Sequence, residues 1–522
     1  MKRGPRRSHR RGGRLGWALW ALLALGGCTL VGPEYEPPAV EAPGAWSTPA
    51  VHGLDPAAAA LDEWWGVFED PVLDALVREA REANPSLEIA ALAVLEARAQ
   101  LALATGLSWP QTQVVAGEAR WTDPPASDLL ELLDVGDFWQ FSLGASVAWE
   151  ADFWGRYRRG VEAAEAAYLA SEEAWNEALV LLTAQVAATY ATVRELEEQL
   201  RISRDNVAIQ QRSYDIAEVL FRNGLNTELD MQQARTLLLS TQATIPGLEA
   251  GLRQARNALS VLLGRPPGGL DDLLAGSTGI PALPADIAVG LPADALRRRP
   301  DVRRAEYVAM AANAQVGLAE ADLYPRFTLT GAIGLSAGGP GDSDFGDLFD
   351  ADALGTSLGA SFVWPFLNYG RIRNNVRVQD ARLQQALVAY RATVLSAARE
   401  AEDAMAGYVG AVEQAAILAQ GVEAAQRSNA LATLRYREGF SDYQRVLDAQ
   451  QRLFGQQQRH VTARGQSVRS LVTLFTALGG GWEGRPATAP LPPETVETLR
   501  ARTDWGDFLD TAEDTGEVGA SR

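Results

Sequence analysis

Cys28 is the single cysteine of the 522-residue chain, and its surroundings indicate a covalent modification rather than catalysis. It ends the run Leu25-Gly26-Gly27-Cys28, which resembles a bacterial lipobox. Small residues give a peptidase access to the backbone, and the thiol then takes a diacylglycerol. We therefore expect Cys28 to become the acylated N-terminus of the mature chain. The alternative is an ordinary signal peptide that happens to contain a cysteine.

The residues before Cys28 follow the order of a signal peptide, so we expect residues 1–27 to be a leader. Residues 1–14 carry one Lys and six Arg, and residues 15–25 are apolar. That apolar run is too short to cross a hydrocarbon core of about 30 Å, and no other segment reaches 18 uninterrupted apolar residues. No transmembrane helix is expected. Thr29, where an aspartate would favour retention in the inner membrane, indicates export to the outer membrane.

The remaining residues offer little for catalysis. His9, His52 and His460 are scattered, and we find no His/Asp/Ser set, metal-ligand spacing or glycine-rich phosphate loop. The formal net charge is −19, and beyond residue 27 there are 40 basic and 66 acidic residues, which argues against nucleic-acid binding. We expect no enzymatic activity, no metal site and no cofactor beyond the lipid on Cys28.

Two halves of the chain repeat each other at an offset of 215 residues. The alignment predicts a gap-free duplication of residues 85–264 as 300–479, joined by a connector at 265–299. Its clearest matches are Ser142-Leu143-Gly144-Ala145-Ser146 with Ser357-Leu358-Gly359-Ala360-Ser361, Gly155-Arg156 with Gly370-Arg371, Gly224 with Gly439, and Leu263-Gly264 with Leu478-Gly479.

Each copy contains a predicted pair of β-strands, near 111–150 and 326–365. Residues 138–150 alternate strictly, with Trp139, Leu143 and Trp149 on the apolar face. The two tryptophans are about 33 Å apart along a strand. At a tilt of ~40° this distance projects to roughly 25 Å, the height of the apolar band of an outer-membrane barrel. The first strand, near 112–121, has an apolar parity that disagrees with its repeat mate, so its register stays open.

Four strands cannot close a barrel, and an open edge in lipid leaves unpaired backbone groups. Two chains would give eight strands with a filled interior, and three would give twelve with an open lumen. The alternative is the edge of a soluble β-sandwich.

The rest of each copy is predicted to be helical, so the chain is mainly α. Residues 155–222 contain an apolar heptad series and span about 100 Å as one helix, with a weaker copy at 370–437. Shorter helices are expected at 85–108, 226–263, 300–323 and 441–478, and pairs of them match the long helices in length. Pro246-Gly247 interrupts one of them, either as a bend that tapers a coil or as a harmless distortion. Segments 28–84, 265–299 and 480–522 are expected around the middle of this helical cylinder.

Together these features resemble the TolC-like outer-membrane efflux family, in particular its NodT/OprM-like lipoprotein branch. The resemblance covers roughly residues 28–480. It is carried by residues 28–35, by Trp64-Trp65 with Phe68 and Asp70-Pro71, by Tyr436-Arg437-Glu438-Gly439 and by Val446-Leu447-Asp448-Ala449-Gln450.

The resemblance implies a homotrimer with a twelve-stranded β-barrel in outer-membrane lipid and an α-helical barrel in the periplasm. It implies that the hairpin tips Asn223, Gly224, Leu225 and Glu438, Gly439, Phe440 contact a periplasmic adaptor. The alternative for the two glycines is that they serve only the turns.

The resemblance also implies a closed periplasmic aperture with a ring of carboxylates, to which Asp448 corresponds. The chain departs from relatives nearby, where Gln444 replaces a leucine and Gln451 an arginine, with Arg445 and Arg452 as candidate substitutes. The alternative for Asp448 is a solvated position on a helix face.

The function implied is a passive exit duct for drugs or other small toxic compounds. An inner-membrane pump of the resistance-nodulation-division (RND) class would supply them through the adaptor. A duct for type I protein secretion and a duct for heavy-metal efflux are the alternatives. The expected location is the outer membrane, lipid-anchored, with most of the mass in the periplasm.

Overall fold

The computed structural model describes residues 30–38, 45–47, 54–55, 61–123, 137–284, 287–290, 292–338, 344–482 and 491–509. Cys28 and the leader lie outside these residues. The chain divides into two units, each described by itself. The strand unit comprises Met1–Pro37, Ala97–Tyr168 and Tyr307–Val388, and the helix unit comprises Pro38–Glu96, Leu169–Glu306 and Ala389–Arg522.

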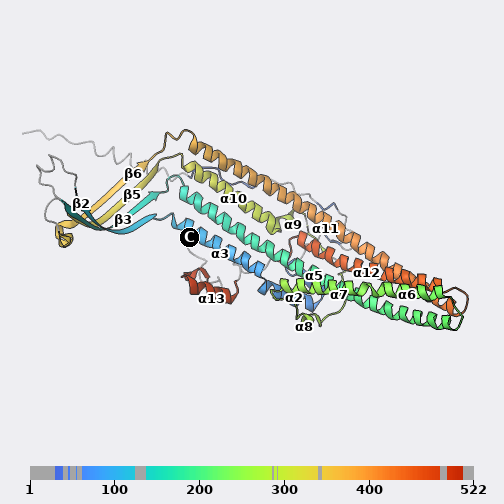
Figure 1. Cartoon of the computed structure of the whole chain (residues 1–522). Helices are drawn as coiled ribbons and strands as arrows, with labels where there is room; N and C mark the ends of the chain where they lie inside the picture. The colour runs from blue at the N-terminus through green and yellow to red at the C-terminus, as the bar shows by residue number, and fades with distance from the viewer. Residues whose placement is uncertain are drawn as a thin grey trace, which may run out of the picture. The chain divides into compact units, whose positions relative to one another are not determined.

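The strand unit contains one antiparallel sheet with the order β2-β3-β5-β6 (Figure 1). The strands are β2 (Thr112–Thr122), β3 (Phe138–Ala151), β5 (Arg326–Gly338) and β6 (Leu354–Val363). The predicted strand pairs are confirmed, and β3 and β5 join the two copies into one sheet. Because β2 and β6 each pair on one side only, both edges of the sheet carry unpaired backbone groups.

The pairing settles the register of the first strand and corrects the gap-free repeat. Thr112 pairs with Ala148, and Arg326 pairs with Val363. Ala148 and Val363 are 215 residues apart, whereas Thr112 and Arg326 are 214 apart, so the copies slip by one residue at this strand. A slip of one residue moves every side chain to the other face of a strand, which explains the disagreement in parity.

Gln111 is the additional residue of the first copy, because it separates Pro110 from β2 while Arg326 directly follows Pro325. Its side-chain amide takes the place of a strand residue opposite Glu150. The Glu150 N–H donates to Gln111 Oε1 at 2.7 Å, and Gln111 Nε2 donates to the Glu150 carbonyl at 3.2 Å. The extra residue therefore extends the hydrogen-bond ladder through its side chain.

The register separates charged from apolar side chains. Glu118, Arg120, Glu150 and Arg326, the charged residues of the four strands, all lie on one face. The other face is apolar and largely exposed in the single chain. Its members include Val115 (78% exposed), Leu143, Ile333 and Leu358 (93% exposed). Trp121 pairs directly with Trp139 at one end of this face, which gives that end an aromatic pair.

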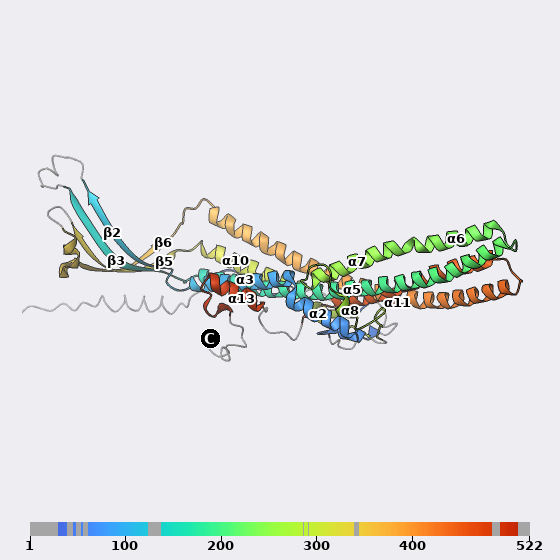
Figure 2. The ribbon, with the colours of Figure 1, turned by 60° about the horizontal axis from the view of Figure 1, so that its bottom comes forward.

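Two helices of 67 residues, α5 (Arg156–Arg222) and α11 (Arg371–Arg437), confirm the predicted long helices. After a tight turn α5 is followed by α6 (Glu228–Gln242) and α7 (Thr244–Leu262), and α11 is followed by α12 (Gln444–Ala477). Figure 2 shows α6 and α7 running back along α5. The remaining repeat helices are α3 (Pro85–Gly106) and α10 (Pro300–Ala321).

The helix expected at 226–263 is split at Ala243, between α6 and α7. Pro246 lies in the first turn of α7, where its missing N–H is tolerated because first-turn N–H groups have no intrahelical partner. The equivalent residue of the second copy is Val461, and α12 runs through it unbroken. The proline therefore accounts for the difference between the two copies.

The heptad series of α5 is buried along only part of its length. Leu179, Val186, Val193 and Leu200 are buried, whereas Phe221, the last member, is 37% exposed. Ser203, Gln210 and Ala217 are buried toward the tip instead. A straight helix drifts by about 20° per heptad, so a strict seven-residue repeat rotates away from its neighbour.

The segments outside the repeats fold beside the helices of the helix unit. They form the short strands β1 (Leu54–Asp55) and β4 (Ile287–Ala288), which pair in parallel, and several short helices. These helices are η1 (Trp64–Phe68), α2 (Pro71–Ala83), α8 (Asp271–Leu274), α9 (Pro292–Arg298), α13 (Pro493–Arg502) and η4 (Gly506–Leu509). In the strand unit, η2 (Phe345–Phe349) and η3 (Ala351–Ala353) precede β6.

Within the described part of the chain, no helix combines the length and the apolar character needed to cross a membrane.

Candidate functional site at the hairpin tips

Each long helix ends in a left-handed glycine, Gly224 (φ 70°) at the first tip and Gly439 (φ 77°) at the second. The Gly224 N–H donates to the Phe221 carbonyl at 2.9 Å and the Leu225 N–H to the Leu220 carbonyl at 2.9 Å. The second tip has the same pair of bonds at Gly439 and Phe440, and this pattern is the Schellman motif. A Cβ added to either glycine would meet no atom within 4 Å. Backbone conformation alone therefore requires glycine at these two turns.

Both tips present an apolar side chain to solvent. Leu225 and Phe440 are each 75% exposed, and Asn223 and Glu438 are exposed beside them. The Asn223 amide turns back to donate to the Val219 carbonyl at 2.7 Å, so it caps the end of α5. The structure thus brings the six predicted tip residues to the two turns, where an apolar residue and a polar residue are accessible at each.

Gln444, Asp448, Gln451 and Arg452 form one exposed face of α12, here called the gate face. Their spacing of four, seven and eight residues places them on one side of a helix. Gln444 Nε2 donates to Asp448 Oδ1 at 3.0 Å. Asp448, Gln451 and Arg452 line a groove of about 640 Å³. The rest of its lining is Leu237, Ser240 and Thr241 of α6 and Phe454, Gly455 and Arg459 of α12. Of the two candidate arginines, Arg452 lines this groove, while Arg445 lies 3.7 Å from Asp442.

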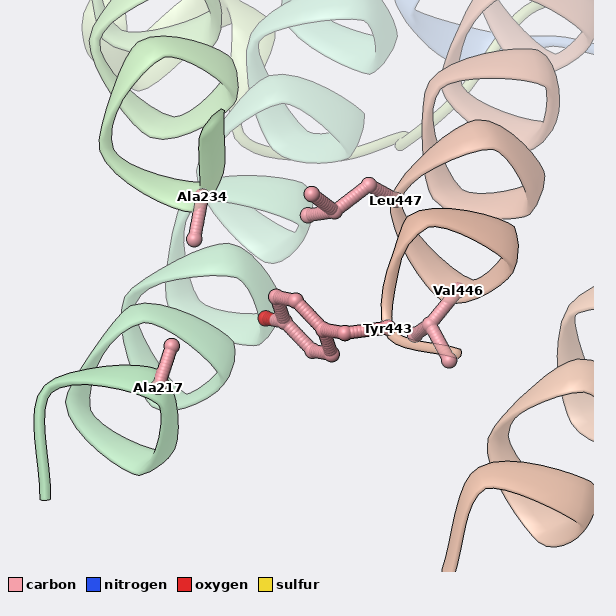
Figure 3. Close-up of a cluster of buried hydrophobic side chains, with 5 residues drawn as sticks. All are labelled: Ala217, Ala234, Tyr443, Val446 and Leu447. Carbon is pink, nitrogen blue, oxygen red and sulfur yellow. The ribbon is translucent and has the colours of Figure 1, made fainter. Parts of the chain in front are cut away.

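The opposite side of α12 anchors the gate face through a buried group, here called the tip cluster: Ala217, Ala234, Tyr443, Val446 and Leu447 (Figure 3). Ala217 comes from α5, Ala234 from α6, and Val446 and Leu447 from the first turn of α12, which Tyr443 directly precedes. The cluster therefore joins both hairpins immediately behind Asp448.

Tyr443 is the anchoring residue that sequence reasoning missed. Its hydroxyl donates to the Ser213 carbonyl of α5 at 2.9 Å, and Gln450 Nε2 donates to Ser213 Oγ at 3.0 Å. Burial raises the pKa of Tyr443 to about 12, so the phenol keeps its proton and remains a donor. The sequence offered a weak signal: Tyr443 and Val446, three residues on, lie on the side of α12 away from Asp448.

Among the described residues, no group of three or more His, Cys, Asp or Glu side chains is placed to hold a metal ion.

The chain is duplicated and mainly helical. It carries an open sheet with one apolar face, and its helical tips are distant in sequence from the strands. This is the architecture of a channel subunit. The family model for outer membrane efflux proteins matches residues 76–265 and 291–480. The chain belongs to this family. The two matched segments are displaced by 215 residues, which confirms the internal duplication.

Relatives and solved structures agree with this assignment. The chain is 33% identical to the solvent efflux pump outer membrane protein SrpC of Pseudomonas putida, over 89% of this chain and 97% of the relative. It is 30% identical to the probable outer membrane lipoprotein SilC of Salmonella typhimurium, over 88% and 97% of the two chains. The structure of the outer-membrane channel OprN superposes with a TM-score of 0.79 at 30% identity, covering 87% of this chain and 99% of that one.

The protein is thus an outer-membrane efflux channel and not an enzyme. The expected fold class is confirmed: a mainly helical chain with four antiparallel strands and a duplicated repeat.

Proposed function

We propose that the protein is the outer-membrane exit duct of a tripartite efflux system and works as a homotrimer. The observation that carries this proposal is the open sheet with its exposed apolar face. In lipid the free edges of β2 and β6 must be satisfied by other strands. Three copies supply twelve strands, which close with the apolar face toward lipid and the face of Glu118, Arg120, Glu150 and Arg326 toward an open lumen.

The cargo that we infer is drugs or other small toxic compounds, passed by an RND-class inner-membrane pump through a periplasmic adaptor. Its support is the similarity to SrpC, whose name describes solvent efflux. The exposed Leu225 and Phe440 would contact the adaptor, because apolar side chains at a helix tip gain most when a partner covers them. Energy comes from the pump, so this chain needs no nucleotide.

Drug susceptibility of deletion strains tests this function. Deleting the gene, or the gene of the adjacent pump, should lower the tolerated concentration of apolar drugs and solvents to a similar extent. Deleting both should add little, because pump and duct act in series. Unchanged drug tolerance together with lost tolerance to copper or silver would favour heavy-metal efflux, and a missing secreted protein would favour type I secretion.

We further propose that Cys28 carries the lipid anchor that holds the protein to the outer membrane. Cys28 lies outside the described residues, so its support is the lipobox-like sequence and the similarity to SilC, which is named a lipoprotein. Cys28→Ala should remove the acyl mass from the intact protein in mass spectrometry. Thr29→Ala is the matched control and should keep it. An unchanged mass in Cys28→Ala would reject the anchor.

The gate face is proposed to close the periplasmic end of the lumen, with Asp448 of three copies converging on the axis. Carboxylates held close together repel, so hydrogen bonds such as that from Gln444 must hold them. Asp448→Ala removes the repulsion together with the three carboxylate side chains that narrow the proposed aperture. We expect the mean single-channel conductance in planar bilayers to rise by about twofold or more, since three shorter side chains leave a wider constriction.

Asp442→Ala is the matched control for the gate. Asp442 is an exposed aspartate six residues earlier that lies beside Arg445 and outside the residues that line the groove. The single-channel conductance of Asp442→Ala should stay at the native value. Equal conductance in native protein and Asp448→Ala would instead support a solvated position for this carboxylate.

A further inference from the structure

Residues Leu30–Pro33, here called the strap, lie against α5 and α10 within the strand unit. The Val31 N–H donates to the Trp154 carbonyl at 3.2 Å, four residues beyond Glu150 of β3. Leu30 lies so close to Gly155 that a Cβ added to Gly155 would collide with the Leu30 side chain. The strap is thus held beside the base of a strand.

Three consecutive strap carbonyls are bound by buried side chains of the two helices. Arg159 of α5, 3% exposed, donates from Nε to the Val31 carbonyl at 3.1 Å and from NH2 to the Gly32 carbonyl at 3.2 Å. Asn313 of α10, 5% exposed, donates from Nδ2 to the Pro33 carbonyl at 2.9 Å. Arg159 NH1 is satisfied by Glu162 at 2.7 Å, which orients the guanidinium. Arg159 and Asn313 are here called the clamp.

The surface of α5 and α10 under the strap, here called the seat, allows the strap backbone to approach closely. Gly32 has a φ of 90° and lies against Gly317 of α10. A Cβ on Gly317 would come within 2.7 Å of Arg159 Nε and 2.9 Å of the Val31 carbonyl oxygen. Gly317 belongs to the second copy and Arg159 to the first, and at the positions equivalent to them by the 215-residue offset the chain has Ala102 and Asn374. The seat is therefore formed once, between α5 of the first copy and α10 of the second, and is not repeated.

We propose that the clamp is a built binding site for the chain's own N-terminal peptide, with Arg159 and Asn313 as positioning residues for the anchor. This proposal rests on the acylation of Cys28 proposed above. Cys28 is two positions before Leu30, a reach of about 7 Å. A clamped strap therefore keeps the acyl chains near the base of β3, whereas an unclamped N-terminal peptide would leave their position unrestrained.

Hydrogen exchange of the full-length acylated protein, read by mass spectrometry on a peptide covering 29–38, tests the clamp. Arg159→Gln should accelerate exchange of this peptide by at least about tenfold, because the strap opens locally while the core stays closed. Gly317→Ala should do the same by filling the seat with a methyl group. The matched controls are Arg204→Gln, an exposed arginine paired with Glu249, and Gly407→Ala, whose Cβ would meet nothing within 4 Å. Both controls should leave exchange unchanged.

Exchange of residues 461–477 of α12 reports whether each variant is folded. If Arg159→Gln fails to fold, Gly317→Ala decides the question. A folded Gly317→Ala or Arg159→Gln with native exchange of 29–38 would overturn the proposal. Release of the strap in a Cys28→Ser variant would also overturn the proposal. This variant is expressed behind a leader that is cleaved without lipid attachment. The mass of the native protein reports acylation separately, so failure of the anchor and failure of the clamp are distinguishable.

Discussion

Ile333→Arg is expected to prevent stable insertion of the sheet, because Ile333 lies near the middle of the apolar face. Ile333 pairs with Ala145 on β3 and with Thr356 on β6, and it is exposed in the single chain. An arginine on the lipid face of a barrel costs about 2–4 kcal/mol at the midplane. Three copies would carry that cost together. The yield of heat-resistant oligomer in isolated outer membranes should fall by roughly tenfold or more.

Ala332→Arg is the matched control, one residue earlier on the same strand. Ala332 pairs with Ser146 and Ser357, on the face that carries the charged strand residues. We expect this variant to insert normally and to shift the ion selectivity of the pore toward anions in bilayer recordings. Equal yields for the two variants, or a larger loss for Ala332→Arg, would mean that the assignment of faces is reversed.

The strand faces show how far the sequence alone could lead. Strict alternation between Trp139 and Trp149 fixed one face, because the side-chain period of a strand is two. The same reasoning failed for Thr112–Thr122. Here the first copy has one extra residue, and a side-chain amide replaces the backbone hydrogen bonds at that point, which a repeat alignment cannot reveal. Gln111 supplies that amide, and only the pairing with Glu150 identifies it.

The site shows the same division. The tip glycines could be predicted, since a positive φ at a helix end is required locally and favours glycine. Tyr443 and the clamp could not, because their acceptors are backbone carbonyls. Any residue has such a carbonyl, so Ser213 and Val31 carry no side-chain signature as partners. A buried polar residue far from its acceptor in sequence is visible only after the chain has folded.

Asp70→Ala is expected to give the largest loss of stability in the helix unit. Asp70, 5% exposed, caps α2 by accepting from the Val72 and Leu73 N–H groups. It also accepts from the Tyr190 hydroxyl at 2.6 Å and the Ser277 hydroxyl at 3.1 Å. Burial raises the pKa of Tyr190 to about 12, so this phenol stays a donor. One carboxylate thus joins α2, α5 and the connector between the two copies.

The cost follows from what the substitution leaves behind. Arg194, also buried, donates to the Tyr190 hydroxyl at 3.0 Å and keeps its own carboxylate, Glu197, at 2.8 Å. The substitution therefore leaves the Tyr190 and Ser277 hydroxyls without this acceptor and removes the cap of α2. Losing the cap costs about 1 kcal/mol and each buried donor left unsatisfied about 1–3 kcal/mol, so the total is about 3 kcal/mol or more. Urea unfolding followed by tryptophan fluorescence should show this loss for Asp70→Ala. Asp70→Asn keeps a good helix cap and should lose less than half as much.

A double-mutant cycle separates this network from simple loss of a cap. Tyr190→Phe alone should destabilise the protein by about 1–3 kcal/mol, because the Asp70 carboxylate and the Arg194 Nε both lose their partner. In the Asp70→Ala background the same substitution should cost about 1–2 kcal/mol less, since the hydrogen bond that it removes is already gone. Strict additivity of the two substitutions would mean that Asp70 and Tyr190 are not energetically coupled. Asp70 would then stabilise α2 and hold the connector through Ser277, but it would not join them to α5.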